Sequence, residues 1–190
     1  MKKIKKLKIK KEGFTLIEML VTMSIFITLV GVITGLFITG IRQQRNVLAF
    51  QSVLDQTSYA LEHMSRNLRL AKKETSGSCL SQSGLNFEIT RSGSGLKFIN
   101  HLQGDDCQEF FLQNNQIQYW KQSTNNSLPL TSNKLEVVSL KFNLTGESQA
   151  DDLQPLVTVF LEIKDKSSPG QSQKIKIQTS VSQRNLDVTY

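Results

Sequence analysis

One stretch of the sequence decides the fold: residues 19–41 read MLVTMSIFITLVGVITGLFITGI and contain no Asp, Glu, Lys or Arg. At a rise of about 1.5 Å per residue, a helix of this length reaches roughly 35 Å, which is enough to cross the hydrocarbon core of a bilayer. A buried core helix is the alternative, but helices of soluble proteins normally keep a polar face. The stretch therefore predicts a transmembrane helix.

The charges on either side of this stretch predict its orientation. The formal net charge of the chain is +7, and seven lysines and one glutamate in residues 1–13 account for +6 of it. Only Arg42 and Arg45 follow the apolar stretch closely. Because positive residues are retained in the cytoplasm, we expect the N-terminus inside and residues 42–190 outside. The nearly neutral remainder argues against a nucleic-acid-binding surface.

A cleaved secretory signal peptide also begins with positive charges, so it has to be distinguished. Such a signal has an apolar region of about 7–15 residues followed by a small-x-small cleavage site. The apolar stretch here is longer, and its best approach to such a site, at residues 38–40, is a poor one. Cleavage after the apolar stretch is therefore not expected.

Six residues immediately before the apolar stretch follow the lysine-rich leader: Gly13-Phe14-Thr15-Leu16-Ile17-Glu18. This arrangement resembles the N-terminal processing signal of type IV prepilins and type II secretion pseudopilins. The resemblance implies that a prepilin peptidase cleaves between Gly13 and Phe14 on the cytoplasmic side and methylates the new Phe14 amine. It also assigns the residues between Phe14 and Glu18 to the processing motif. The chain is then the substrate of that reaction and not its catalyst.

The chemistry of these residues agrees with such a site. Gly13 has no side chain, so a protease can approach the backbone closely. Glu18 lies four positions after Phe14, which would place both on one helix face. A carboxylate at the centre of a membrane helix costs roughly 2.5–3.5 kcal/mol and needs a cationic partner. The resemblance implies the Phe14 amine of a neighbouring subunit as that partner; the alternative is that Glu18 reaches the lipid headgroups.

The helix is predicted to continue beyond the membrane. Apolar positions recur at spacings of three and four, with one Thr among them: Val47, Phe50, Leu54, Thr57, Leu61, Met64, Leu68 and Ala71. This pattern predicts one helix from about Phe14 to Lys73, with a stop around Gly77. We expect the stripe to anchor the helix to its own domain, and a coiled-coil partner is the weaker alternative.

Short alternating segments replace the helical pattern after residue 74. They predict strands at residues 85–90, 96–101, 109–113, 116–121, 135–144, 156–164 and 174–182. The turn residues 92–95 and 114–115 predict two hairpins. The expected organisation is a leader at 1–13, a transmembrane helix at 14–41, its continuation at 42–74 and a β domain at 75–190. The fold class is α+β, a long N-terminal helix on antiparallel sheet, and the resemblance implies a pilin-like form of it.

The two cysteines, Cys79 and Cys107, both lie in the part predicted to be outside, where disulfides persist. A disulfide between them is expected, and two free buried thiols are the alternative. Two cysteines are too few for a structural zinc site. The acidic pairs Asp105-Asp106 and Asp151-Asp152 lack calcium-ligand spacing and are expected to be solvated turns, although some members of the family bind calcium. No metal or cofactor is predicted.

The sequence offers no catalytic constellation. Neither His63 nor His101 has a partnering cysteine nucleophile, and the sequence has no Walker loop and no His-Glu-x-x-His motif. An enzyme is therefore not expected. A signal-anchored ectodomain that binds a ligand without polymerising is the main alternative function, but it has no need for Gly13 and Glu18 at these positions.

Residues 61–71, 135–144 and 178–186 look like the J-class minor pseudopilins. Such subunits are thought to lie at the filament tip and to start assembly. The resemblance implies four partners: the prepilin peptidase, other pilin or pseudopilin subunits, the inner-membrane assembly platform and membrane lipid. It implies a single-pass protein of the cytoplasmic membrane that later enters an extracytoplasmic filament. A minor pilin of a type IV pilus or a competence system would have nearly the same sequence.

Overall fold

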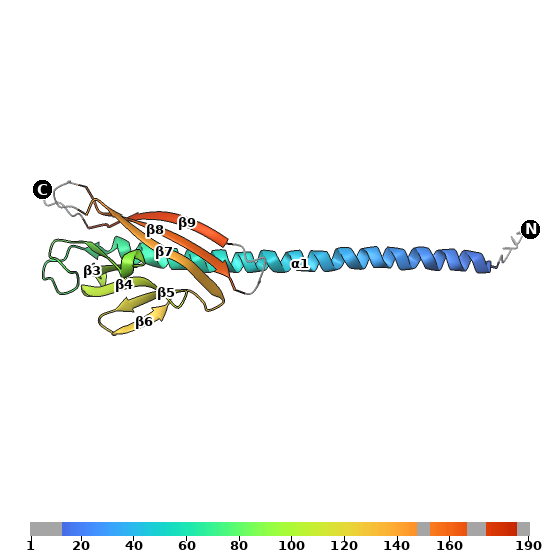
Figure 1. Ribbon diagram of the computed structural model, residues 1–190, viewed down its shortest axis with the longest axis horizontal. Helices are drawn as coiled ribbons and strands as arrows, with labels where there is room; N and C mark the ends of the chain where they lie inside the picture. The colour runs from blue at the N-terminus through green and yellow to red at the C-terminus, as the bar shows by residue number, and fades with distance from the viewer. Residues whose placement is uncertain (1–12, 148–152, 167–173, 186–190) are drawn as a thin grey trace, which may run out of the picture. The chain divides into compact units, whose positions relative to one another are not determined.

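The computed structural model describes residues 13–147, 153–166 and 174–185. Within them it has one long α-helix, two short 3₁₀ helices and nine strands in two antiparallel sheets (Figure 1). The chain divides into two compact units, residues 1–46 and 47–190. The predicted α+β class, with a long N-terminal helix packed against antiparallel sheets, is confirmed.

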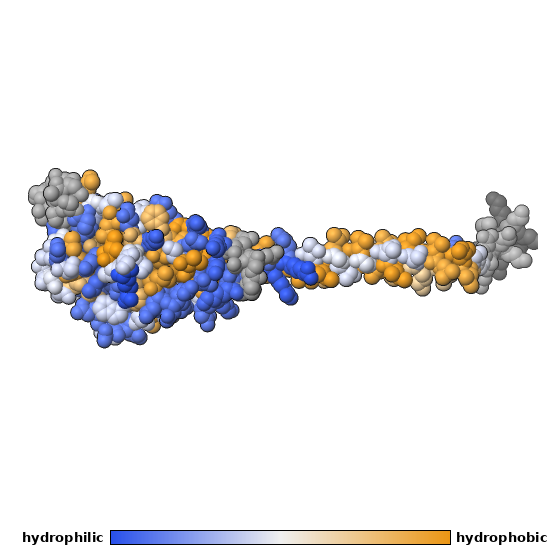
Figure 2. Space-filling view, viewed as in Figure 1, coloured by the Kyte–Doolittle hydropathy of each residue, from blue (hydrophilic) through white to orange (hydrophobic). Residues whose placement is uncertain are grey.

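Helix α1 runs from Leu16 to Arg69. In the N-terminal unit all its large apolar side chains point outward: every one from Phe14 to Ile41 is between 38% and 81% exposed. Figure 2 shows the resulting hydrophobic surface. The helix is long and apolar enough to span a membrane. In its most apolar segment, no residue is buried by the described part of the chain.

The second part of α1 packs through a face that only partly coincides with the stripe that the apolar spacing predicted. The helix buries six residues: Val53, Thr57, Ala60, Met64, Asn67 and Leu68. The prediction was wrong for Val47 and Leu54, which are 47% and 37% exposed, whereas Val53 is 1% exposed. Thr57, Met64 and Leu68 belong to the predicted stripe and are buried, as expected. The buried face also contains the small residue Ala60 and the polar residue Asn67, which a search for large apolar residues passes over.

The helix ends at Arg69 and not at Lys73. Its last carbonyls are satisfied by distant parts of the chain: the Arg184 N–H donates to the Arg69 oxygen (2.7 Å) and the His101 N–H donates to the Leu70 oxygen (3.0 Å). Strand β1, Ala71–Lys72, then pairs with β3. Tertiary hydrogen bonds therefore end the helix, before the chain reaches the predicted stop at Gly77.

Sheet 1 has the strand order β1-β3-β4-β5-β6, and β2 also pairs with β3. Its further strands are β2 (Phe87–Thr90), β3 (Gly95–Asn100), β4 (Asp106–Gln113), β5 (Gln116–Lys121) and β6 (Asn126–Pro129), with 3₁₀ turns at Arg91–Gly93 and His101–Gln103. Both predicted hairpins are present. Asn114 and Asn115 take φ values of 52° and 59°, as a two-residue hairpin turn of type I′ requires. The short strands β1 and β6 were not predicted.

Sheet 2 contains β7 (Leu135–Thr145), β8 (Leu156–Asp165) and β9 (Lys174–Ser182) in that order, close to the predicted bounds. One hydrophobic core joins both sheets to α1 and includes Phe98, Phe110 and Leu140. A second, smaller cluster contains Cys79, Leu80, Ile99 and Cys107. Because neighbouring residues of a strand point to opposite faces, Phe98 and Ile99 assign the two clusters to opposite faces of sheet 1.

Candidate processing and assembly site

The predicted cleavage site lies in front of the helix. Residues 13–15 have no helical structure, and nothing lies within 4 Å of a side chain built at Gly13. Phe14 is 77% exposed, and the following Leu16 and Ile17 are also exposed. The Gly13–Phe14 peptide bond is therefore open to a protease within the described part of the chain. The leader, residues 1–12, lies outside the described residues.

Thr15 and Glu18 form a capping box at the start of α1. The Glu18 N–H donates to Thr15 Oγ1 (3.3 Å), and the Thr15 N–H donates to Glu18 Oε2 (3.5 Å). Reciprocal bonds of this kind satisfy backbone donors that a helix start leaves free. The helix therefore begins at Leu16, two residues after the predicted start. Of these two bonds, only the one from the Thr15 N–H involves the Glu18 carboxylate, and at 3.5 Å it is long, so the carboxylate is held only weakly.

The hydroxyl groups of the apolar stretch are satisfied inside the helix. Each Ser and Thr between residues 19 and 41 donates to a backbone carbonyl three or four positions earlier, at 2.8–3.0 Å: Thr22, Ser24, Thr28, Thr34 and Thr39. Such bonds let hydroxyl residues lie in an apolar medium without an unpaired donor. Glu18 is therefore the one charged side chain that this part of α1 would bring to a membrane.

Cys79 and Cys107, predicted to pair, are joined by a disulfide with their Cα atoms 5.6 Å apart. The loop that carries Cys79 is organised by Glu74, a residue that the sequence analysis did not single out. Burial alone would raise the pKa of Glu74, but backbone hydrogen bonds from Cys79 and Ser76, the Ser76 hydroxyl and the Leu80 N–H outweigh it and lower the pKa to about 2. In the sequence Glu74 is a single glutamate close to several serines, and nothing there indicated that it organises the loop.

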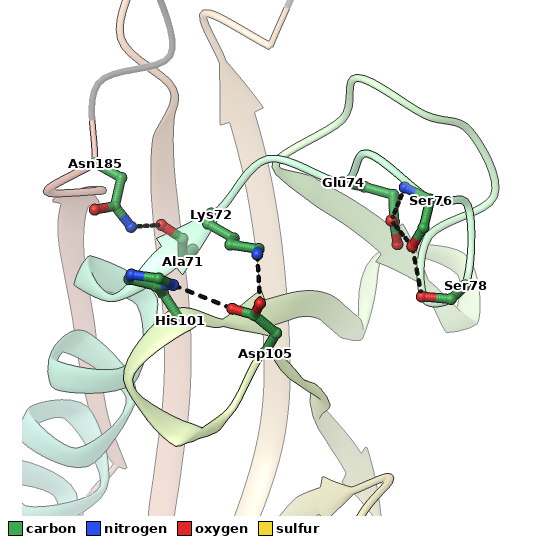
Figure 3. A network of polar contacts seen from close by, with 8 residues as sticks. All are labelled: Ala71, Lys72, Glu74, Ser76, Ser78, His101, Asp105 and Asn185. Carbon is green, nitrogen blue, oxygen red and sulfur yellow. Dashed lines mark hydrogen bonds and ion pairs between the residues drawn. The ribbon is translucent and has the colours of Figure 1, made fainter.

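The acidic pair Asp105-Asp106 is occupied by protein groups. Asp105 contacts Lys72 Nζ (2.6 Å) and His101 Nδ1 (3.1 Å), as Figure 3 shows. These hydrogen bonds, Lys72 first, lower the pKa of Asp105. Asp106 accepts from the N–H and hydroxyl of Ser123, both at 2.9 Å. Among the described residues no group of three or more His, Cys, Asp and Glu side chains is arranged to hold a metal ion; Asp151-Asp152 lies outside them.

His63 packs edge-on against the stacked rings of Phe110 and Tyr119, with centroid distances of 6.0 and 5.0 Å. Burial, followed by the charges of Lys121 and Arg66, lowers the pKa of His63. The neutral ring is therefore favoured at this position, in a packing role.

A buried amide network, also missed from the sequence, ties α1 to sheet 1. Asn100 Nδ2 donates to Asn67 Oδ1 (2.9 Å) and Gln108 Oε1 (3.2 Å), and Gln108 Nε2 donates to Gln103 Oε1 (2.8 Å). Asn67, Asn100 and Gln108 are each at most 4% exposed. The sequence offered one indication of this network: Asn67 lies three residues after Met64 and therefore on the packed face of the helix.

The structure thus brings Thr15 to Glu18 in the first unit and Cys79 to Cys107 in the second. Comparisons with protein-family models, with curated proteins and with solved structures find no match to the chain.

Proposed function

We propose that the chain is a pilin-like structural subunit. It is processed by prepilin peptidase and assembles into a type II secretion pseudopilus or a type IV pilus-like filament. One observation carries the proposal: Gly13-Phe14-Thr15-Leu16-Ile17-Glu18 lies at the start of a 54-residue helix that is apolar and exposed up to Ile41 and then packs on its own β domain.

The open Gly13–Phe14 bond supports cleavage at this point. Cleavage creates a positively charged amine on Phe14, close to the level of Glu18. A lone carboxylate in lipid is costly, and so is a lone ammonium, so both gain from pairing. The long bond from the Thr15 N–H to the Glu18 carboxylate is easily exchanged for the amine of a neighbouring subunit. Membrane insertion of one subunit thereby favours the addition of another.

Within such a filament we assign the chain to the minor subunits that act at the tip or in initiation. This finer assignment rests on the similarity of residues 61–71, 135–144 and 178–186 to J-class minor pseudopilins. The N-terminus would lie in the cytoplasm and the β domain outside, as the lysine-rich leader favours. Its partners would be the peptidase, other pilin-like subunits, the assembly platform of the inner membrane and lipid.

The test separates two roles of Glu18, helix capping and charge pairing between subunits. Glu18→Ala removes both. Thr15→Val removes the hydroxyl half of the capping box and leaves the carboxylate, so it serves as the matched control. We expect both variants to be inserted and cleaved, because removing a charge from lipid makes insertion easier. Crosslinking to other pilin-like subunits should be lost in Glu18→Ala and kept in Thr15→Val.

Intact-mass measurement of the membrane form reports cleavage in the same samples. Equal loss of crosslinking in both variants would assign Glu18 to capping alone. Wild-type crosslinking of cleaved Glu18→Ala would contradict charge pairing. Absence of any crosslink between the wild-type chain and another pilin-like subunit would favour the anchored ectodomain that does not polymerise.

A further inference from the structure

The segment between β1 and β2 is a long loop whose centre is a buried carboxylate. Residues 75–80 belong to no helix or strand, yet Cys79 and Leu80 are buried in the smaller hydrophobic cluster. Glu74, at the start of the loop, is 1% exposed. Carboxylates are rarely buried unless they are fully hydrogen-bonded, so the surroundings of this side chain decide its role.

Both oxygens of Glu74 are used by the loop itself. Oε1 accepts from the Ser76 N–H (2.8 Å), the Ser76 hydroxyl (2.9 Å) and the Gly77 N–H (2.9 Å). Oε2 accepts from the Cys79 N–H (2.9 Å) and the Leu80 N–H (3.3 Å). Figure 3 shows Glu74 beside Ser76, with Ser78 continuing the chain of hydroxyl contacts. The loop is therefore wrapped around one negative charge.

The base of the loop is closed without any sulfur atom. The Glu74 N–H donates to the Leu85 oxygen and the Gly84 N–H donates to the Glu74 oxygen, each at 2.8 Å. Cys107, the partner of Cys79, is held by β4, where it lies opposite Ile99 of β3. The backbone of each cysteine is thus positioned by hydrogen bonds that do not depend on the disulfide.

We infer that Glu74 is a positioning residue that shapes the loop before the disulfide forms and presents Cys79 to Cys107. In this order of events the reduced protein already holds both thiols close together. A disulfide oxidant then completes the reaction in two exchanges. One cysteine thiolate attacks the oxidant and releases a thiol, and the other cysteine thiolate attacks the mixed disulfide and releases a second thiol. The two cysteines are oxidised, the oxidant is reduced to two thiols, and the thiol protons of the cysteines end on these products.

The test measures the rate of oxidation of the full chain in detergent micelles. The protein is reduced, freed of reductant and mixed with glutathione disulfide without denaturant; samples are alkylated at intervals and weighed by mass spectrometry. Glu74→Gln keeps the size of the side chain but replaces one carboxylate oxygen by an NH₂ group. That group cannot accept hydrogen bonds from the backbone N–H groups that surround it. The matched control is Glu88→Gln, because Glu88 accepts from the Ser81 N–H (2.9 Å) of the same loop but does not contact Cys79.

We expect Glu74→Gln to slow disulfide formation by about tenfold or more, since several charge-assisted hydrogen bonds are lost, and Glu88→Gln to stay within about twofold of the wild type. Equal rates for the wild type and Glu74→Gln would overturn the inference.

A second measurement decides the matter if Glu74→Gln does not fold. Hydrogen exchange of the amides of residues 76–80 is compared in oxidised wild type and in Cys79→Ala, which has no disulfide. Protection of the Gly77 and Leu80 amides should persist in Cys79→Ala, because their acceptor is Glu74. Loss of that protection to the level of an unstructured loop would show that the disulfide, and not Glu74, fixes the loop.

Discussion

Replacing Leu68 by alanine should destabilise the second unit far more than the same change at Leu54. Leu68 is fully buried in the core between α1 and the sheets, and a leucine-to-alanine change at such a site costs about 2–5 kcal/mol, part of it for the cavity that remains. Leu54 is 37% exposed, and water fills the space, so we expect a loss of about 1 kcal/mol. The expected difference is therefore about 1–4 kcal/mol, and most of it reports packing, because a leucine-to-alanine change alters helix propensity only slightly at either position.

The assay is urea unfolding of the full chain in detergent micelles, followed by the fluorescence of Trp120. The measured quantity is the difference between the free energies of unfolding of the two variants. The comparison is valid if both variants unfold with the same m-value. The apolar spacing in the sequence assigns both leucines to one stripe, whereas the structure separates them. Equal destabilisation by the two variants would refute the helix face described here.

Three other outcomes are expected. The mature protein should begin at Phe14 with a methylated amine, and Gly13→Leu should leave the longer precursor in the membrane; intact-mass analysis checks both, and a cut beyond residue 40 would contradict the assignment. Because the pKa of Glu74 is lowered to about 2, its contribution to stability should be complete above about pH 4.5 and fade as the pH falls toward 2; the change, roughly 3 kcal/mol, should be absent from acid titrations of Glu74→Gln. Because the pKa of His63 is also lowered, folding favours the neutral ring, so stability should decline as the pH falls below about 6.5, and thermal unfolding of His63→Gln should show a smaller decline.

Much of the fold could be predicted because its signals are local. The charge-free stretch at residues 19–41 predicts a helix by composition alone, and Asn114-Asn115 predicts a hairpin because both residues tolerate positive φ. The end of α1 could not be predicted, because Arg69 is capped by Arg184, more than a hundred residues later. Strand β1 was missed for a similar reason: two residues have no alternation to detect, and only β3 makes them a strand.

The candidate site divides in the same way. The cysteine pair was visible from residue types and their positions, and so was the resemblance of residues 13–18 to a processing signal, which stays a prediction. The capping box was not predicted, although Thr15 and Glu18 have its spacing, because the helix was expected to begin before them. Glu74 was missed because its role depends on a loop that folds back on it. Contacts within an irregular loop produce no repeating pattern of residue types that the sequence could reveal.

The amide network between Asn67 and sheet 1 has a mechanical consequence. Apolar side chains can slide past one another at modest cost, but the bond between Asn67 and Asn100 exists in one register only. A shift of the helix by one turn, about 5.4 Å, would break this bond, while Asn67 Nδ2 keeps the His63 oxygen and Asn100 Nδ2 keeps Gln108. The cost is that of one buried hydrogen bond, about 1 kcal/mol. A force applied along residues 47–69 of α1 would therefore also load this hydrogen bond and, through it, Asn100 and Gln108 of sheet 1. Displacement of this part of α1 along its axis would therefore carry the β domain with it.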